Sequence, residues 1–308
     1  MVHTTKKSSE RLKQRTALLS VCTATFLAAL KLVYSILTGS LTMLASTVDS
    51  IFDILASLMN FFSIRESAKP PDAEHKYGHG KIESLAALFQ SVIIFASAGF
   101  IIYKAISSII HRTEITHIEE GIIVMFISTI VSILLTLTLR RVAKKTNSIV
   151  LKTDSLHYEV DIYQNLGVLL TITIIYFTSW YIIDAVVGIL IGFYIIRQVW
   201  RIFKQAFDCL MDHELPNELR QKMKKIILSH NDVHGIHNFR TRQAGSTKFV
   251  DFHAELSAEI PLERANIIAH EIEKMIQDQS PHTEVLIHLD PYDDSKIDVL
   301  RKNKVYGA

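Results

Sequence analysis

The sequence is poor in cysteine and in net charge. Its 308 residues include only two cysteines, Cys22 and Cys209, and the formal net charge is +2 at pH 7. Two cysteines exclude a disulfide framework and a cysteine-rich metal motif, so we interpret both as packing residues. A net charge this small gives no indication of nucleic acid as a partner. The H-E-x-x-H motif of zinc hydrolases is also absent from the sequence.

Apolar residues are abundant instead, and they are unevenly distributed. They make up 49% of the chain and concentrate before about Cys209. Runs close to the length needed to cross a bilayer, about 20 residues, recur six times. The basic start of the chain resembles a signal peptide, but the apolar run behind it is too long for one. We place the predicted spans at 16–37, 42–64, 81–109, 118–139, 149–178 and 181–204.

Basic residues distinguish the two sides of this predicted bundle. Lysine and arginine are frequent in the N-terminal segment and in the connections after the second and fourth spans. The tight loops 38–40 and 178–180, on the other side, carry none. Because positively charged loops stay on the cytoplasmic side, we predict that both termini are cytoplasmic.

The segment after Asp212 is polar and has different periodicities. Two stretches are typical of amphipathic helices and three alternate like β-strands. In chain order they are 216–230, 233–245, 248–257, 261–279 and 283–291. The order αββαβ predicts a small α+β layer with helices packed on one sheet. The fold class is therefore an all-α six-helix transmembrane bundle (1–211), then a cytoplasmic α+β domain (212–293) and a polar tail (294–308).

Ionisable residues interrupt the second and fifth spans. Asp49 and Asp53 are four residues apart, and His157 and Asp161 have the same spacing. Residues four apart share one face of a helix, and charges at membrane depth mark functional sites. One imidazole and three carboxylates can close a tetrahedron around a divalent cation. We therefore predict a metal site, although the same residues could instead line a water-filled cleft or pair with basic groups.

The connection 70–81 holds a second group of ligand residue types. Asp72, His75 and His79 lie in a segment that starts with two prolines and contains two glycines, which predicts a loop. Their side chains can ligate a metal ion. An exposed polar loop without a metal is the alternative interpretation.

Three motifs taken together resemble those of the cation diffusion facilitator family. They are TVDSIFD, KYGHGKIES and HYEVD, at residues 47–53, 76–84 and 157–161. The chain is similar to the bacterial zinc and ferrous-iron efflux branch over nearly its whole length. The resemblance implies a homodimeric divalent metal ion/proton antiporter of the bacterial inner membrane, and not an enzyme. It would export Zn²⁺ or Fe²⁺, and Cd²⁺ and Co²⁺ also suit its ligands.

The resemblance also implies roles for individual residues. The transport site falls on the four intramembrane residues, and a histidine among them is associated with zinc-type substrates. The loop residues Asp72, His75 and His79 would form a peripheral metal site. Lys81 and Asp212 would pair and tie the third span to the cytoplasmic domain.

In the cytoplasmic domain the resemblance implies a metallochaperone-like fold with a binuclear, regulatory Zn²⁺ or Fe²⁺ site. One ligand would be a histidine on the second helix, where this sequence has Asn266. Either His270, one turn later, takes its place, or the second metal is weakened. The candidate ligands are His237, His253, His270, His288 and Asp290.

Two other classes of function compete with a transporter. A membrane-embedded metalloenzyme, such as an intramembrane hydrolase, needs an open metal position, and four protein ligands leave none. A metal sensor with a membrane anchor does not explain six spans with ligands at depth. We therefore expect an antiporter whose partners are divalent metal ions, protons, the lipid bilayer and a second copy of the chain, and not nucleic acid.

Overall fold

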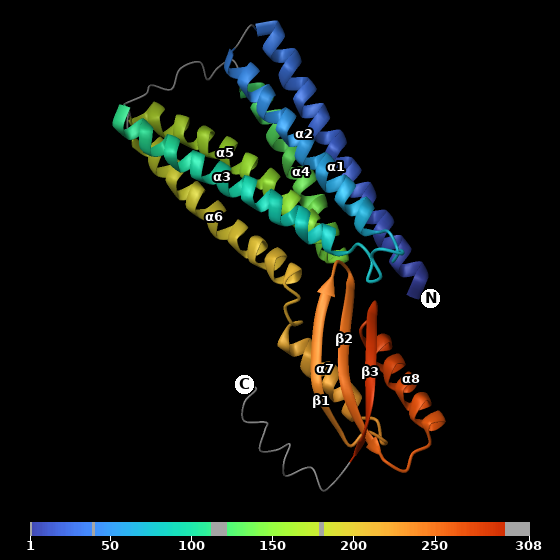
Figure 1. Cartoon of the computed structure of the whole chain (residues 1–308). Helices are drawn as coiled ribbons and strands as arrows, with labels where there is room; N and C mark the ends of the chain where they lie inside the picture. The colour runs from blue at the N-terminus through green and yellow to red at the C-terminus, as the bar shows by residue number, and fades with distance from the viewer. Residues whose placement is uncertain (1, 39–40, 112–121, 179–181, 293–308) are drawn as a thin grey trace. The chain divides into compact units, whose positions relative to one another are not determined.

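The computed structural model describes residues 2–38, 41–111, 122–178 and 182–292. The chain divides into two compact units between Leu210 and Met211. Each unit has a hydrophobic core of its own. In Figure 1 the first unit is coloured from blue to yellow and the second from orange to red.

Six long helices make up most of the described residues of the first unit. They are α1 (Val2–Thr38), α2 (Leu41–Ser67), α3 (Lys81–His111), α4 (Ile122–Thr146), α5 (Ile149–Thr178) and α6 (Ile182–Leu210). Even the shortest, α4, has 25 residues, more than the about 20 that cross a bilayer. The predicted six-helix transmembrane bundle is confirmed.

Four of these helices contain stretches that are long and apolar enough to span a membrane, judged by length and composition of the described residues. The other two, α2 and α5, carry the predicted intramembrane ligands. The four stretches are Ser8–Leu37, Lys81–Ser107, Val124–Thr146 and Ala185–Leu210.

Small residues allow α3 and α6 to lie side by side along much of their length (Figure 1). A Cβ atom added to Gly192 of α6 would lie 2.4 Å from Ile102 of α3, which is too close for any real contact. A Cβ atom at Gly188 would lie 3.1 Å from that of Ala105. Small residues at such positions are the usual means of close helix packing in membranes.

The first helix begins well before its apolar run, at Val2 rather than near residue 16. Its polar start includes Lys13, whose side chain is only 2% exposed. Lys13 Nζ lies 2.8 Å from Glu10 and 2.7 Å from Glu83 of α3. The ion pairs satisfy the buried ammonium group, so the helix extends beyond its apolar run.

The second unit has the predicted αββαβ order. Its elements are α7 (Asn217–Leu228), β1 (Gly235–Ala244), β2 (Thr247–Ser257), α8 (Leu262–Gln279) and β3 (Thr283–Tyr292). The sheet order is β1-β2-β3, with β1 antiparallel and β3 parallel to β2. Gly245 adopts φ +59° in the turn between β1 and β2, a conformation that glycine adopts at no steric cost.

The two helices of this unit cover one face of the sheet (Figure 1). Along α8 the buried residues Ala265, Ile268, Ile272 and Ile276 recur every three or four positions, which is the spacing of one helix face. They pack in a core with Met223 and Ile227 of α7 and apolar residues of β2.

Candidate metal sites

Helices α2 and α5 bring three of the predicted ligands together inside the first unit. Nε2 of His157 lies 3.0 Å from Oδ1 of Asp53. One ligand atom each from Asp53, His157 and Asp161 lies within 4.8 Å of the others. We call these three residues the transport cluster. Because His157 and Asp161 are one helical turn apart, both face Asp53 across the helix pair.

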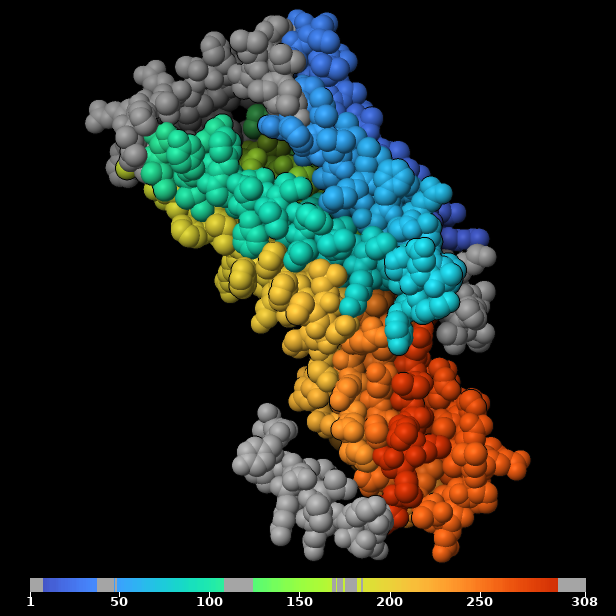
Figure 2. Space-filling view, viewed as in Figure 1, coloured from blue at the N-terminus to red at the C-terminus, as the bar shows by residue number. Residues whose placement is uncertain are grey.

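Asp49, the fourth predicted ligand, is exposed and lies outside the transport cluster. It lines the same cleft, which has a volume of about 1280 Å³ between α2, α3, α5 and α6. Figure 2 shows a hollow between the blue surface of α2 and the green surface of α3. All four predicted residues therefore reach one cavity that is large enough to admit a hydrated ion.

Lys31 is a charged neighbour of this region that sequence reasoning did not connect to it. Its Nζ donates to Oγ of Ser50 on α2 at 2.7 Å, and Ser50 follows Asp49 in the chain. A lysine inside an apolar run was a visible signal, but which helix it contacts depends on tertiary packing.

The loop between α2 and α3 brings Asp72, His75 and His79 together. Oδ1 of Asp72 lies 3.5 Å from Nδ1 of His75, and Oδ2 lies 3.3 Å from Nε2 of His79. The backbone N–H of His75 donates to the carboxylate of Asp72 at 2.6 Å. This hydrogen bond, with smaller contributions from the backbone of Glu74 and the two histidines, lowers the pKa of Asp72.

The ionised carboxylate beside two imidazoles is a donor set that suits a divalent cation. Nδ1 of His79 is buried and has no hydrogen-bond partner among the described residues. The nitrogen of His79 nearest to Asp72 is Nε2, at 3.3 Å, so Nε2 is the atom that would bind a metal ion at the predicted peripheral site.

In the second unit, three histidines align in one row across the sheet. His237 of β1 pairs in register with His253 of β2, which in turn pairs with His288 of β3. Each has a ring nitrogen near the carboxylate of Asp290, at 3.1 Å, 2.8 Å and 3.2 Å respectively. We call these four residues the sheet cluster.

The electrostatics of the sheet cluster favour an ionised Asp290. Burial alone would raise its pKa. The hydrogen bond with His253 and the charges of His253, His288 and His237 outweigh that effect, so the pKa is lowered. Three imidazoles and a carboxylate are a zinc-type donor set.

His270 lies apart from the sheet cluster. It is 70% exposed, and its Nδ1 lies 3.4 Å from Glu273 on the same helix. A different residue, Glu255 of β2, contacts the sheet cluster: its Oε1 lies 2.9 Å from Nδ1 of His237. Sequence reasoning missed Glu255, although strand alternation places it on the same face as His253.

The predicted pair of Lys81 and Asp212 joins residues of different units and stays a prediction. Within the first unit, Nζ of Lys81 donates to the carbonyl of Leu210 at 3.3 Å. Within the second, Oδ1 of Asp212 lies 3.7 Å from the guanidinium of Arg242.

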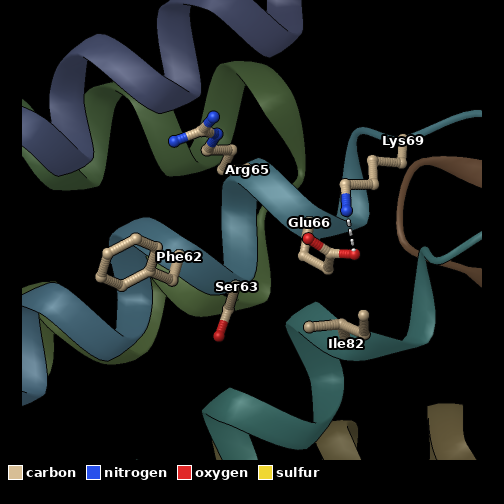
Figure 3. A pocket seen from close by; sticks show the side chains of 6 residues that line it. All are labelled: Phe62, Ser63, Arg65, Glu66, Lys69 and Ile82. Atoms are coloured by element: carbon tan, nitrogen blue, oxygen red, sulfur yellow. Dashed lines mark hydrogen bonds and ion pairs between the residues drawn. The ribbon is translucent and has the colours of Figure 1, made fainter.

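A smaller, open pocket of about 380 Å³ lies at the end of α2 (Figure 3). The one carboxylate among its lining residues, Glu66, already pairs with Lys69 at 2.6 Å. This pocket therefore offers no donor set for a metal ion. Its other lining residues are Phe62, Ser63, Arg65 and Ile82.

Two family models match the two units of the chain. The cation efflux transmembrane domain matches residues 17–211, and the cytoplasmic domain of cation efflux proteins matches residues 215–292. The chain belongs to the cation efflux family. The resemblance found in the sequence motifs is thereby confirmed.

Named relatives of this cation efflux protein match it nearly end to end. Protein p34 of Rickettsia prowazekii (strain Madrid E) is 37% identical and covers 92% of this chain and 94% of its own. The cation-efflux pump FieF of Citrobacter koseri is 38% identical and covers 91% and 93%. A solved metal-bound C-terminal domain of the CzcD transporter from Thermotoga maritima is 21% identical, covers 24% of this chain and 87% of its own, and gives a TM-score of 0.23.

Membership of this family decides the broad class of function. Cation efflux proteins are membrane transporters of metal cations, not enzymes. The expectation that the chain is no enzyme is confirmed, and the intramembrane hydrolase is set aside.

Proposed function

We propose that this cation efflux protein exports Zn²⁺ or Fe²⁺ from the cytoplasm in exchange for protons. It acts in the bacterial inner membrane with both termini in the cytoplasm. The observation that supports this most is the transport cluster of Asp53, His157 and Asp161, which shares its cleft with Asp49. One imidazole among carboxylates favours Zn²⁺ and Fe²⁺ over ions such as Mn²⁺ and Mg²⁺ that prefer oxygen ligands alone.

The contact between α2 and α5 explains why protons would be the counter-ion. Nε2 of His157 and Oδ1 of Asp53 are 3.0 Å apart, and a hydrogen bond between an imidazole nitrogen and a carboxylate requires a proton between them. A metal ion bound by both atoms has to displace that proton, because only deprotonated ligands coordinate. Metal and proton therefore exclude each other at the same pair of atoms.

Transport follows from this exclusion when the site faces each side in turn. On the cytoplasmic side a metal ion enters the cleft and releases protons from the ligands. On the outer side protons return to His157 and the carboxylates and release the metal ion. A protonated imidazole and protonated carboxylates do not coordinate, so protonation and metal binding alternate at these ligands.

The cytoplasmic unit has a separate role in this proposal. Its sheet cluster would hold a regulatory metal ion through His237, His253, His288 and Asp290, whose mutual contacts fit a zinc-type ligand set. The unit would also pair with a second copy of the chain, and the loop residues Asp72, His75 and His79 would form a peripheral site.

Zinc flux into proteoliposomes that contain a trapped zinc dye tests the proposed function. Asp53→Ala and Asp161→Ala should each reduce zinc affinity at least about 100-fold. Removing even a residue that only supports a metal ligand typically lowers metal affinity about 10–100-fold. Asp278→Ala removes an exposed carboxylate from α8 and should leave flux unchanged. Normal zinc flux in a well-folded Asp161→Ala protein would contradict the proposal.

A further inference from the structure

A buried hydrogen bond joins α2 and α5 beside the transport cluster. Nδ2 of Asn60 donates to Oδ1 of Asp154 at 3.0 Å, and both side chains are fully buried. Asn60 lies two helical turns after Asp53, and Asp154 lies three residues before His157. Both residues therefore lie on the helix faces that carry the metal ligands.

A second set of contacts adds α1 to this connection. The hydroxyl of Tyr158 lies 3.1 Å from Oγ of Ser57 on α2 and 3.2 Å from Oγ of Ser20 on α1. The two serine hydroxyls are 3.2 Å from each other. All three side chains are buried, with at most 1% exposed. We call the five residues Ser20, Ser57, Asn60, Asp154 and Tyr158 the polar clamp.

The polar clamp is costly in terms of stability. Among the described residues, Oδ1 of Asn60 is buried without a hydrogen-bond partner. A buried polar group without a partner costs about 1–3 kcal/mol, and apolar side chains would join helices without that penalty. Stability alone therefore does not explain these residues.

Directional contacts provide what apolar packing does not, which is one fixed arrangement of the two helices. Hydrogen bonds constrain both distance and angle, whereas apolar side chains tolerate sliding and rotation. Tyr158 is next in sequence to His157, and their rings are in edge contact at 5.6 Å between centroids. Any rotation of α5 that breaks the Tyr158 contacts also moves the imidazole.

We propose that the polar clamp sets the separation and rotation of α2 and α5 and so decides which divalent ion the transport cluster accepts. Its members are positioning residues for the site of the proposed function, on which this inference rests. Zinc bonds to nitrogen and oxygen are short, at about 2.0–2.2 Å. Ligands from two different helices meet that requirement only when the helices are held to within about 0.5 Å. When α2 and α5 are held less firmly, the affinity for a larger ion such as Cd²⁺ falls less than the affinity for Zn²⁺.

Two small substitutions test the proposal in the full-length protein. Tyr158→Phe removes a single hydroxyl group, and Asn60→Leu replaces an amide by an apolar group of similar size. Each should lower the affinity for Zn²⁺ about tenfold or more and that for Cd²⁺ much less, so that the Zn²⁺/Cd²⁺ preference falls. Flux and binding with each metal alone give the ratio. Asp154→Asn keeps an oxygen that accepts from Asn60 and should retain a ratio near that of the wild type, whereas Asp154→Leu should not.

Control variants separate positioning from general stability. Ser148→Ala removes another buried hydrogen bond of the same unit, from Ser148 to Glu83 at 2.7 Å, and should leave the metal ratio unchanged. An unchanged ratio in both Tyr158→Phe and Asn60→Leu, with reduced thermal stability or without it, would overturn the inference. Undiminished binding of both metals by Asp161→Ala would instead overturn the proposed function. If Asn60→Leu fails to fold, the nearly isosteric Tyr158→Phe decides the question alone.

Discussion

His157 is the only nitrogen donor among the four predicted transport ligands, and the choice of metal is expected to depend on it. His157→Asp exchanges this nitrogen for oxygen, so preference should shift from Zn²⁺ toward Mn²⁺, which favours all-oxygen sites. Competition between the two metals in flux assays measures the shift. If the ratio stays as in the wild type, selectivity resides elsewhere.

Substitutions in the sheet cluster should reduce zinc binding far more than substitutions of other histidines in the same unit. His253 occupies the middle of the row and contacts Asp290 at 2.8 Å, so His253→Ala should strongly reduce zinc binding by the cytoplasmic unit. His270→Ala should change little because His270 is 70% exposed and lies apart from the cluster. Calorimetric titration with zinc compares the two. A larger loss in His270→Ala would mean that α8 supplies a ligand after all.

At the residue scale, the sequence indicated ligands wherever spacing within one element brings them together. His157 with Asp161 is an example, because a helix fixes their common face, whereas Asp49 has the same spacing from Asp53 but lies outside the transport cluster. Contacts between different helices or strands could not be predicted from the sequence. Glu255 reaches His237 through strand register, and Lys31 reaches Ser50 through helix packing. Neither register nor packing is encoded in local periodicity.

Helix α8 illustrates how one face of an element stabilises the cytoplasmic unit. Ile268 is 0% exposed in the core, whereas its neighbour Ile267 is 42% exposed. Ile268→Ala should lower the free energy of unfolding of a fragment covering residues 212–292 by about 2–5 kcal/mol. Ile267→Ala should change it by about 0.5 kcal/mol or less. Urea unfolding of both variants gives the comparison, and equal losses would show that this face is assigned wrongly.

At the element scale, the type and order of the helices and strands could be predicted, but several ends could not. Apolar runs locate the part of a helix that lies among lipid or protein, not its polar extensions. The start of α1 and the end of α4 at Thr146 both lie outside the spans predicted from the sequence, 16–37 and 118–139. In α1 the extension depends on the ion pair of Lys13 with Glu83, two residues far apart in sequence.

At the scale of the whole molecule, the chain combines a cation efflux transmembrane domain and a cytoplasmic domain of that family, with separate cores. The family match covers both, so they belong to one transporter. We propose that a divalent metal ion and a proton compete for the contact between His157 and Asp53. Competition at one site predicts a transport rate that depends on the direction of a proton gradient.

Zinc flux in proteoliposomes across imposed pH gradients of both signs measures this dependence most directly. With zinc added outside, an acidic interior should speed zinc accumulation, because protons displace the metal ion from the ligands as the site opens inward. An acidic exterior should slow it, because protonated His157 and carboxylates do not take up zinc. The same rate under both gradients, in a protein that demonstrably carries zinc, would contradict the exchange of metal for protons.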